Sequence, residues 1–275
     1  MKYINYRIVG LMLAIGIIST SCDSYLEEEN RSSITIETAI SEQETLDQLV
    51  ASVYERAREN TTRYTSDMYY VLEDMGTDIA TRRTPIQGVD EINDYVNMNS
   101  FTWATGVYWS NQYSIIAAAN TAIDNAPSIS GLTENERSKG IGEAKFFRAW
   151  RYFSLVENYG GVPLVLNQVI SADNEYIRAS EQEVYTQIVQ DLQDAISSVD
   201  TNPSAYGRVS KDAARHLLSK VLLTRGYKDF ALASDFTEAA TLAEAVIASH
   251  PLVSSFSDLV SIDNQRNSEV IFSYL

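Results

Sequence analysis

Three acidic residues, Glu73, Asp74 and Asp78, lie close together in the sequence. Two carboxylates that flank a glycosidic bond can hydrolyse it when they stand about 5 Å or about 6.5–9.5 Å apart. Carboxylate oxygens also bind calcium, but the sequence has no regularly spaced acidic loop of the kind that binds this ion. Because the sequence fixes no separation between the three side chains, hydrolysis and calcium binding remain alternatives. We assign no catalytic residue and no metal ligand.

The segment that follows, residues 76–106, breaks the periodic pattern of its neighbours and reads as a long loop excursion. Loops of this length are uncommon unless they are functional. A sugar site needs aromatic faces for the apolar side of the ring and a few placed polar groups for the hydroxyls. The segment supplies both, and our candidate ligand-binding residues are Trp103, Arg82, Arg83, Tyr95 and Asn99, with Asn97 beside them. The alternatives are that Trp103 packs onto the helical body and that the two arginines are solvated charges.

Composition excludes several other chemistries. Two His and one Cys are too few for most zinc sites and for an intrachain disulfide. No nucleophile elbow and no phosphate-binding loop is present. Lys and Arg number 21 against 37 Asp and Glu, a net charge of −16 that repels nucleic-acid phosphates. We therefore expect no cofactor and no nucleic-acid partner.

The N-terminus reads as an export signal. A basic start precedes an apolar run over residues 8–18, which is shorter than the ~20 residues that a spanning helix needs. Small residues then lead to Cys22, as in a lipoprotein signal whose cysteine carries the lipid. We predict a signal over residues 1–21, lipid attachment at Cys22 and an acidic tether over residues 22–40. The alternative is an ordinary secretory signal with a chance cysteine.

The rest of the chain has the apolar periodicity of helices. Capping boxes at Ser41, Thr133 and Ser180 mark three of the helix starts. The expected helices cover residues 41–60, 65–75, 107–126, 133–159, 180–199, 211–230 and 235–249. Pairs of such helices with small contact residues are typical of tetratricopeptide units, which must stack to bury their apolar faces. The predicted fold is all-α, with tetratricopeptide-like repeats and the one long loop excursion.

Two features of these helices are interpreted as structural. Asn120 recurs on the apolar stripe that contains Trp109 and Tyr113, and we expect it to make a buried hydrogen bond. The aromatic residues of the helix that ends near Tyr159 form two adjacent rows, which predicts burial on most sides and no cofactor site.

Several segments together resemble the SusD/RagB family of outer-membrane nutrient-binding lipoproteins. The strongest match is GEAKFFRAWRYF at residues 142–153, which continues to YGGVPL at residues 159–164. Its family form is E-A-K-F-L-R-A-x-x-Y-F followed by Y-G-x-V-P-L. Supporting matches are the cysteine with YLE shortly after it, the helix from Trp109 to Ile123, residues 213–223, and NSEVIF at residues 267–272.

The resemblance implies a surface-exposed lipoprotein of the outer membrane that closes over a SusC-type TonB-dependent transporter. Such a protein captures glycans, or sometimes peptides, and passes them to the pore without cleaving them. In the family, the segment before the Trp–Tyr helix often carries ligand-binding aromatics and an arginine, which agrees with residues 76–106. The alternatives are a helical scaffold that contacts only the transporter, and a glycosidase.

The resemblance also bears on the extent of the chain. Family members are usually considerably longer, and the NSEVIF element normally opens their C-terminal half. Here residues 268–275 form an apolar, strand-like run at the end of the sequence. We therefore expect residues 41–275 to be the N-terminal helical domain of a longer protein whose C-terminal half is missing.

Overall fold

The computed structural model describes residues 45–62, 72, 74–81, 89–99, 101–171 and 175–273, and for residues 60–62 only the backbone. The predicted signal, Cys22, the tether, Arg82, Arg83 and most of the predicted helix 65–75 lie outside these ranges. The helices, in chain order, are α3 (Thr45–Thr62), α5 (Asp90–Asn93), α6 (Trp103–Asn125), η2 (Ala126–Ser128), α7 (Glu134–Tyr159), α8 (Glu181–Ser198), α9 (Lys211–Arg225), α10 (Asp235–Ser249), α11 (Phe256–Leu259) and η3 (Ile262–Asn264). No strand occurs in the described ranges, so the all-α prediction is confirmed.

Local sequence signals start α7, α8 and α9 where they were expected. The Thr133 hydroxyl accepts a hydrogen bond from the Glu136 amide, and the Glu136 carboxylate accepts one from the Thr133 amide, at 3.3 and 2.8 Å. Ser180 and Glu183 form the same reciprocal pair at the start of α8. Such a capping box satisfies two amides that the first turn of a helix leaves without partners. The boxes predicted at Thr133 and Ser180 are therefore confirmed, the one predicted at Ser41 lies outside the described residues, and Ser210 caps α9 through its hydroxyl.

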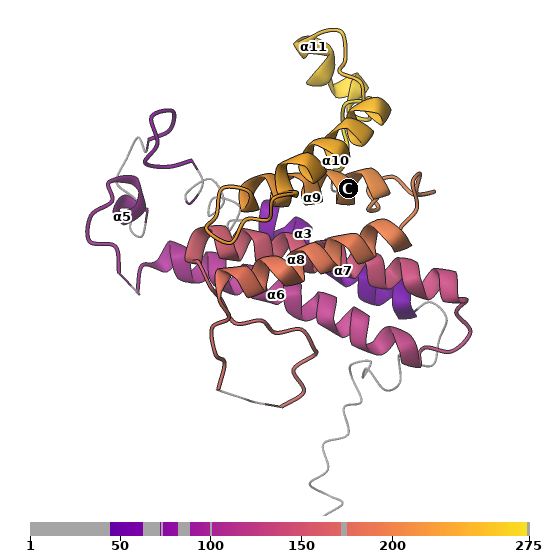
Figure 1. The fold of residues 1–275 in the computed structure, drawn as a ribbon, viewed down its shortest axis with the longest axis horizontal. Helices are drawn as coiled ribbons and strands as arrows, with labels where there is room; N and C mark the ends of the chain where they lie inside the picture. The colour runs from indigo at the N-terminus through magenta and orange to yellow at the C-terminus, as the bar shows by residue number, and fades with distance from the viewer. Residues whose placement is uncertain are drawn as a thin grey trace, which may run out of the picture. The chain divides into compact units, whose positions relative to one another are not determined.

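Helix α7 lies at the centre of the packing (Figure 1). It packs against α3, α6 and α8, while α8 packs against α9 and α9 against α10. This succession of neighbours is the stacking expected of tetratricopeptide-like pairs. Phe147, Ala149, Tyr152 and Leu155 are fully buried, which confirms that α7 is covered on most sides. Gly142 allows α7 and α8 to approach, since a Cβ there would stand 2.8 Å from the Cβ of Ser198.

Two predicted helix ends differ from the structure. Helix α6 begins at Trp103, a turn before the expected residue 107, because Ala104 and Tyr108 continue its apolar stripe into a second small core. Helix α9 ends at Arg225 and not near residue 230. Gly226 follows it and lies against the ring of Phe236 on α10, where a Cβ would approach to 2.6 Å. Both shifts come from contacts with residues distant in the sequence.

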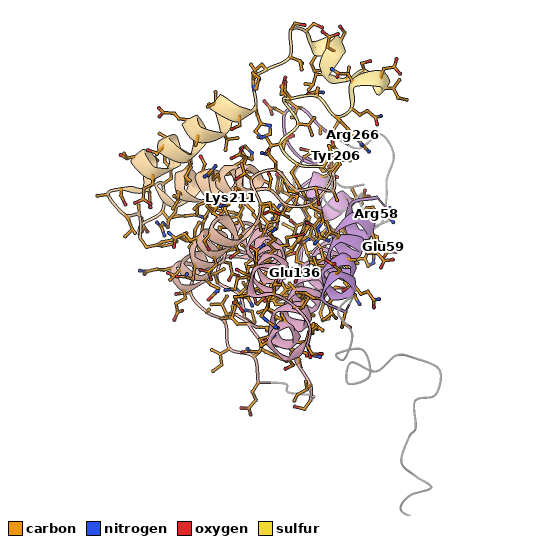
Figure 2. All side chains as sticks on the ribbon, turned by 90° about the vertical axis from the view of Figure 1, so that its right-hand side faces the viewer. Arg58, Glu59, Glu136, Tyr206, Lys211 and Arg266 are labelled. Atoms are coloured by element: carbon orange, nitrogen blue, oxygen red, sulfur yellow. The ribbon has the colours of Figure 1, made fainter. Side chains whose placement is uncertain are left out.

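Residues 268–273 are irregular, where the sequence suggested a strand. Phe272 packs against the rings of Phe146, Phe147 and Trp150 on α7, with centroid distances of 5.6–6.3 Å. The guanidinium of Arg266 lies 4.4 Å from the ring centre of Tyr206 (Figure 2). The last two residues, 274 and 275, lie outside the described ranges. The apolar pattern of this run is therefore explained by the packing of its side chains onto α7 and not by pairing with a neighbouring strand.

None of the helices in the described ranges has both the length and the apolarity of a membrane-spanning segment.

Candidate functional site

The long excursion folds back on itself at Gly76. This glycine has φ of +74°, and a Cβ there would lie 2.9 Å from the carbonyl oxygen of Asn93 and 2.9 Å from the ring of Tyr95. Glycine adopts positive φ without the steric cost that other residues incur. The close approach brings residues 74–81 against residues 89–95. Thr81 continues the contact by donating a hydrogen bond to the Asn93 side chain at 3.2 Å.

A small second core fixes the excursion to the helical body. Its buried members are Val89, Ile92, Ala104 and Tyr108. Tyr159, at the end of α7, packs against this core and donates a hydrogen bond to the Thr105 carbonyl at 2.7 Å. Burial raises the pKa of Tyr159 to about 12, so the hydroxyl remains a donor at physiological pH. The start of α6 is therefore held by packing and by this hydrogen bond.

The backbone between the small core and α6 adopts unusual conformations. Tyr95 and Asn97 have φ of 54° and 57°, in the left-handed region that few non-glycine residues occupy. Asn99 organises the next turn, because its side chain donates to the Asn97 carbonyl at 2.9 Å and accepts from the Phe101 amide at 2.8 Å. Strained backbone of this kind clusters at ligand-binding sites. The side-chain amide of Asn99, one of the predicted ligand residues, is therefore already hydrogen-bonded to the backbone of the loop.

Three aromatic side chains of this region are accessible. Trp103 is the first residue of α6 and is 52% exposed, and Tyr95 is 65% exposed. Phe101 is 92% exposed and was missed by the sequence reasoning, although its place two residues before Trp103 is the signal that would have found it. Apolar rings at a rigid, exposed turn are suited to a ligand with an apolar face. Arg82 and Arg83, the predicted charged partners, lie outside the described residues.

The acidic residues at the start of the excursion form no metal centre in the part of the chain that the structure describes. Asp74 and Asp78 are exposed, and Glu73 lies outside the described residues. The backbone carbonyl of Asp74 accepts a hydrogen bond from the Thr77 hydroxyl at 2.6 Å, so this stretch is organised as a turn. The carboxylate pair considered from the sequence stays a hypothesis.

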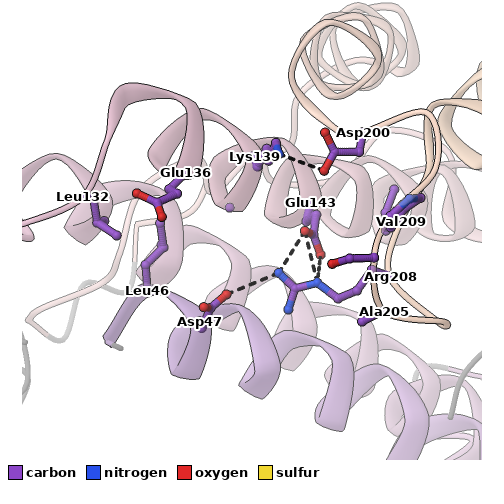
Figure 3. Close-up of a pocket in the computed structure, with 13 residues that line it drawn as sticks. Leu46, Asp47, Leu132, Glu136, Lys139, Glu143, Asp200, Ala205, Arg208 and Val209 are labelled. Atoms are coloured by element: carbon purple, nitrogen blue, oxygen red, sulfur yellow. Dashed lines mark hydrogen bonds and ion pairs between the residues drawn. The ribbon is translucent and has the colours of Figure 1, made fainter. Parts of the chain in front are cut away.

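A pocket of about 760 Å³ opens between α3, α7 and the segment that joins α8 to α9 (Figure 3). Most of its charged side chains pair with one another. Arg208 donates to the Glu143 carboxylate at 2.9 Å, Tyr54 donates to the same carboxylate, and Lys139 lies 2.8 Å from Asp200. Burial raises the pKa of Glu143, against the opposing pull of Arg208. These pairs tie three elements together, so we interpret this pocket as structural.

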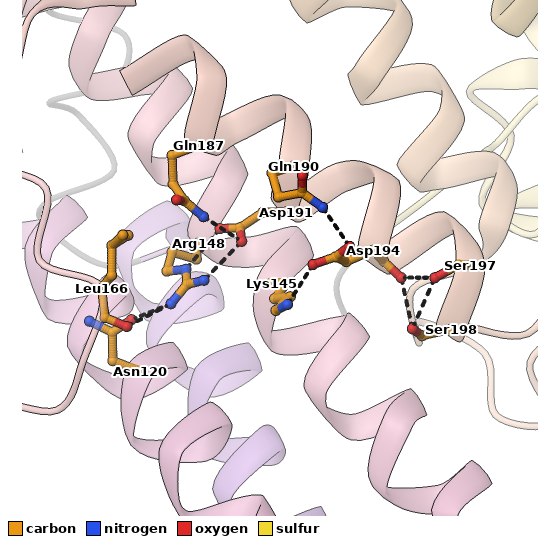
Figure 4. A network of polar contacts seen from close by, with 10 residues as sticks. All are labelled: Asn120, Lys145, Arg148, Leu166, Gln187, Gln190, Asp191, Asp194, Ser197 and Ser198. Atoms are coloured by element: carbon orange, nitrogen blue, oxygen red, sulfur yellow. Dashed lines mark hydrogen bonds and ion pairs between the residues drawn. The ribbon is translucent and has the colours of Figure 1, made fainter. Parts of the chain in front are cut away.

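The sequence motif on α7 has a structural role as well (Figure 4). Arg148 makes two hydrogen bonds of 2.8 Å to Asp191 on α8 and donates to the Asn120 side chain at 2.9 Å. The Asn120 amide donates in turn to the Val165 carbonyl at 2.8 Å. The predicted buried hydrogen bond of Asn120 is therefore confirmed. This network joins α6, α7, α8 and the chain after α7.

Comparison with protein families gives one match that covers most of the chain. Residues 24–246 match the SusD-like family model, which is described as starch-binding and associating with the outer membrane. Among curated proteins, SusD-like protein P25 of Formosa agariphila is 24% identical over 92% of this chain and 48% of its own length. SusD-like protein P2 of the same organism is 33% identical over 57% of this chain and 30% of its own length. The chain thus spans half or less of the length of these relatives.

Solved structures show the same fold. A laminarin-binding SusD-like protein matches 84% of this chain and 51% of its own, with a TM-score of 0.72 and 23% identity. The protein NanU of B. fragilis matches 90% of this chain and 50% of its own, with a TM-score of 0.73 and 22% identity. A structure described with a xylogluco-oligosaccharide matches 83% of this chain and 46% of its own, with a TM-score of 0.69 and 23% identity. Because the family model covers most of the chain and these structures share its fold, the chain belongs to the SusD-like family.

Proposed function

We propose that this chain is part of a lipid-anchored outer-membrane lipoprotein that captures glycans and delivers them, without cleavage, to a SusC-type TonB-dependent transporter. In this proposal residues 1–21 are the signal, Cys22 carries the lipid, residues 22–40 are the tether, and residues 41–275 form the helical domain. Acyl chains on one cysteine would hold the protein at the membrane surface. The protein would face the cell exterior, where its ligand is found.

The observation that carries the proposal is the half-exposed indole of Trp103 at the start of α6. The small core below fixes the backbone that bears it, so the ring is presented without a large ordering cost on binding. Tyr95 and Phe101 add exposed rings within the same short stretch. Membership of a family described as starch-binding supports a glycan as the ligand class.

The test is affinity electrophoresis of the protein in gels that contain laminarin or xyloglucan, the glycans named for two similar structures. We expect retardation in at least one gel, and we expect Trp103→Ala to weaken binding roughly tenfold, which corresponds to ~1.4 kcal/mol. Tyr227→Ala is the control, because Tyr227 is also an exposed aromatic residue, at 80%, and lies beyond the end of α9. Unchanged binding by Trp103→Ala would overturn the assignment of the site.

Further experiments test the transporter partner, the class of ligand and the absence of cleavage. Co-purification of a TonB-dependent transporter with the protein extracted from membranes supports delivery to that partner. A chain that co-purifies with the transporter but binds no glycan would instead act as a scaffold. Retardation by a peptide matrix and not by a glycan would assign peptide capture. Shortened glycan products after incubation would restore the glycosidase alternative, whose carboxylates would come from Glu73, Asp74 and Asp78.

A further inference from the structure

A second concave site lies on α6, separate from the excursion. It is a pocket of about 370 Å³ between the middle of α6 and the chain that joins α7 to α8. Pockets that bind small molecules have volumes of this order, about 300–1,000 Å³. Most of its lining is apolar or aromatic. The residues that carry the argument are Trp109, Tyr113, Asn167, Val169 and Tyr176.

The aromatic floor of this pocket is fixed in place. The rings of Trp109 and Tyr113 lie 5.0 Å apart, at an angle of 43°. Tyr159 meets the Trp109 ring edge-on at 5.0 Å, from the side of the helical body. The Tyr113 hydroxyl donates to the Pro163 carbonyl at 2.7 Å. Two rings held in this way form a preorganised platform, which lowers the ordering cost of binding.

The opposite wall is equally constrained. The Val165 amide donates to the Tyr152 hydroxyl at 2.7 Å, and that hydroxyl donates to the Val165 carbonyl at 2.9 Å. Asn120 donates to the carbonyls of Val165 and Asn167 at 2.8 and 3.2 Å. An irregular segment of chain is thus fastened to α6 and α7 at a defined distance from the platform. The shape of the pocket therefore follows from buried hydrogen bonds and not from a chance loop conformation.

Polar groups beside this platform remain available for a ligand. Within the described ranges, no hydrogen bond engages the indole N–H of Trp109 or the hydroxyl of Tyr176, which is 47% exposed. The Asn167 amide is held only by a 3.5 Å contact with Asp124. Tryptophan and tyrosine that present a ring together with a free polar tip suit a ligand with one apolar face and a polar edge.

We propose that this pocket binds a saccharide ring, as a second glycan site separate from the excursion at Trp103. The proposal rests on the proposed function, because the ligand class is the same. The ring would stack on Trp109 and Tyr113, with its hydroxyls toward Tyr176 and Asn167. An apolar side chain from a peptide would fill the same space but would bury the Trp109 N–H without a partner, which costs about 1–3 kcal/mol. A sugar hydroxyl both accepts and donates, so a hydroxyl beside the edge of the indole can accept from that N–H.

The test exploits the three tryptophans of the chain, Trp103, Trp109 and Trp150. In protein labelled with 5-fluorotryptophan, each gives one fluorine NMR signal, assigned through single Trp→Phe variants. Laminarin and xyloglucan oligosaccharides are the probes. Trp150, on α7, packs against Phe272 of the C-terminal segment, lines neither site and is the internal control. We expect saturable shifts of the Trp103 and Trp109 signals, each with its own dissociation constant, and none of the Trp150 signal.

Variants separate the two sites. Tyr176→Ala should raise the dissociation constant measured from the Trp109 signal roughly two- to tenfold. The dissociation constant measured from the Trp103 signal should not change. Trp103→Phe removes the Trp103 signal itself and should leave the response of the Trp109 signal unchanged. Tyr176 is a surface residue, so its loss is not expected to unfold the chain. Tyr176→Phe keeps the ring and removes only the hydroxyl, and an intermediate loss of affinity would support the hydrogen bond to the sugar.

The outcomes distinguish this proposal from the proposed function. A response of Trp103 without one of Trp109 would overturn the second site and leave glycan capture standing. A response of Trp109 to N-acetyltryptophanamide and not to the oligosaccharides would show that the pocket takes apolar side chains, and would overturn the saccharide assignment. The absence of any response from Trp103 and Trp109 to both oligosaccharides would overturn the two proposals together.

Discussion

Arg148 on α7 donates two hydrogen bonds of 2.8 Å to the carboxylate of Asp191 on α8, and both side chains are almost fully buried. The planar guanidinium matches the carboxylate edge to edge, a geometry that lysine cannot provide. The remaining donors of Arg148 reach Asn120 and the Leu166 carbonyl, each at 2.9 Å. One ion pair therefore sets the relative position of α6, α7, α8 and the chain after α7. That chain is also the wall of the pocket beside Trp109.

The first prediction concerns this ion pair. Arg148→Ala leaves the Asp191 carboxylate buried without its cation, so the free energy of unfolding should fall by about 3–5 kcal/mol. Urea denaturation followed by circular dichroism measures the change. Lys145→Ala is the control, because Lys145 pairs with Asp194 at 2.6 Å on the partly exposed side of the same two helices. It should cost less than about 1 kcal/mol. Equal losses in the two variants would contradict the structural role of Arg148.

A second prediction uses two glycines of long helices as a matched pair. Gly142→Ala places a Cβ 2.8 Å from Ser198 and 3.2 Å from Val199, so overpacking should destabilise the protein by about 1–3 kcal/mol. Gly106→Ala meets no heavy atom within 4 Å and should stabilise it by about 0.5–1 kcal/mol through helix propensity. Thermal unfolding of the two variants compares them directly. Similar shifts of the melting temperature in both would show that α7 and α8 are not packed as closely as described.

A third prediction tests whether the fold of the excursion supports ligand binding. Gly76 has positive φ and no room for a Cβ, so Gly76→Ala should disturb the contact with Tyr95 and weaken glycan binding. Gly131 has φ of +78° but meets nothing within 4 Å. Gly131→Ala should therefore cost about 1–2 kcal/mol of stability and leave binding unchanged. If both variants bound glycan like the parent protein, the excursion would not position the site.

The fourth prediction concerns pH. Asp235 is buried, and burial alone would raise its pKa, but hydrogen bonds from Arg225 and from the Leu232 amide hold the pKa below its usual value of 3.8. Between the folded and unfolded pKa values the unfolded chain binds more protons, so stability rises with pH there. The contribution of Asp235 is therefore fully present above the unfolded pKa and is lost as pH falls through the folded one.

Asp235→Asn has no carboxyl group to titrate, so comparing this variant with the parent protein isolates the contribution of Asp235. Urea denaturation of both proteins from about pH 6 to about pH 2 should show a constant difference in unfolding free energy at the upper end. The difference should shrink as the pH falls below 3.8, the unfolded value. A difference that stayed constant across the whole range would mean that the Arg225–Asp235 pair does not lower the pKa of Asp235.

The sequence predicted the elements whose signals are local. The capping boxes at Thr133 and Ser180 lie within four residues, so the starts of α7 and α8 could be placed from the sequence alone. The start of α6 could not, because Ala104 is buried by Val89 and Ile92, which reach it only through the folded excursion. A helix boundary set by tertiary contact has no local signature.

In the candidate site, too, the sequence indicated residue types but not the contacts that depend on the folded chain. Residue type and position singled out Trp103 and Tyr95, and both are exposed. The sequence could not show that the Asn99 side chain is engaged with the loop backbone, since that depends on the turn geometry. It also gave no hint that Tyr176 lines a pocket with Trp109, because the two residues meet only when the chain after α7 is fastened to α6. From its periodicity alone, Trp109 is a member of the apolar stripe of the helix expected over residues 107–126.

Glycan capture without cleavage is the central claim, and calorimetric titration of the protein with laminarin and xyloglucan oligosaccharides tests it most directly. Each sample is then analysed for new reducing ends. If the protein captures glycans without cleaving them, the titration gives a saturable heat of binding with at least one glycan, and the oligosaccharides keep their length. No heat with either glycan, or a rise in reducing ends that grows with time, would contradict it.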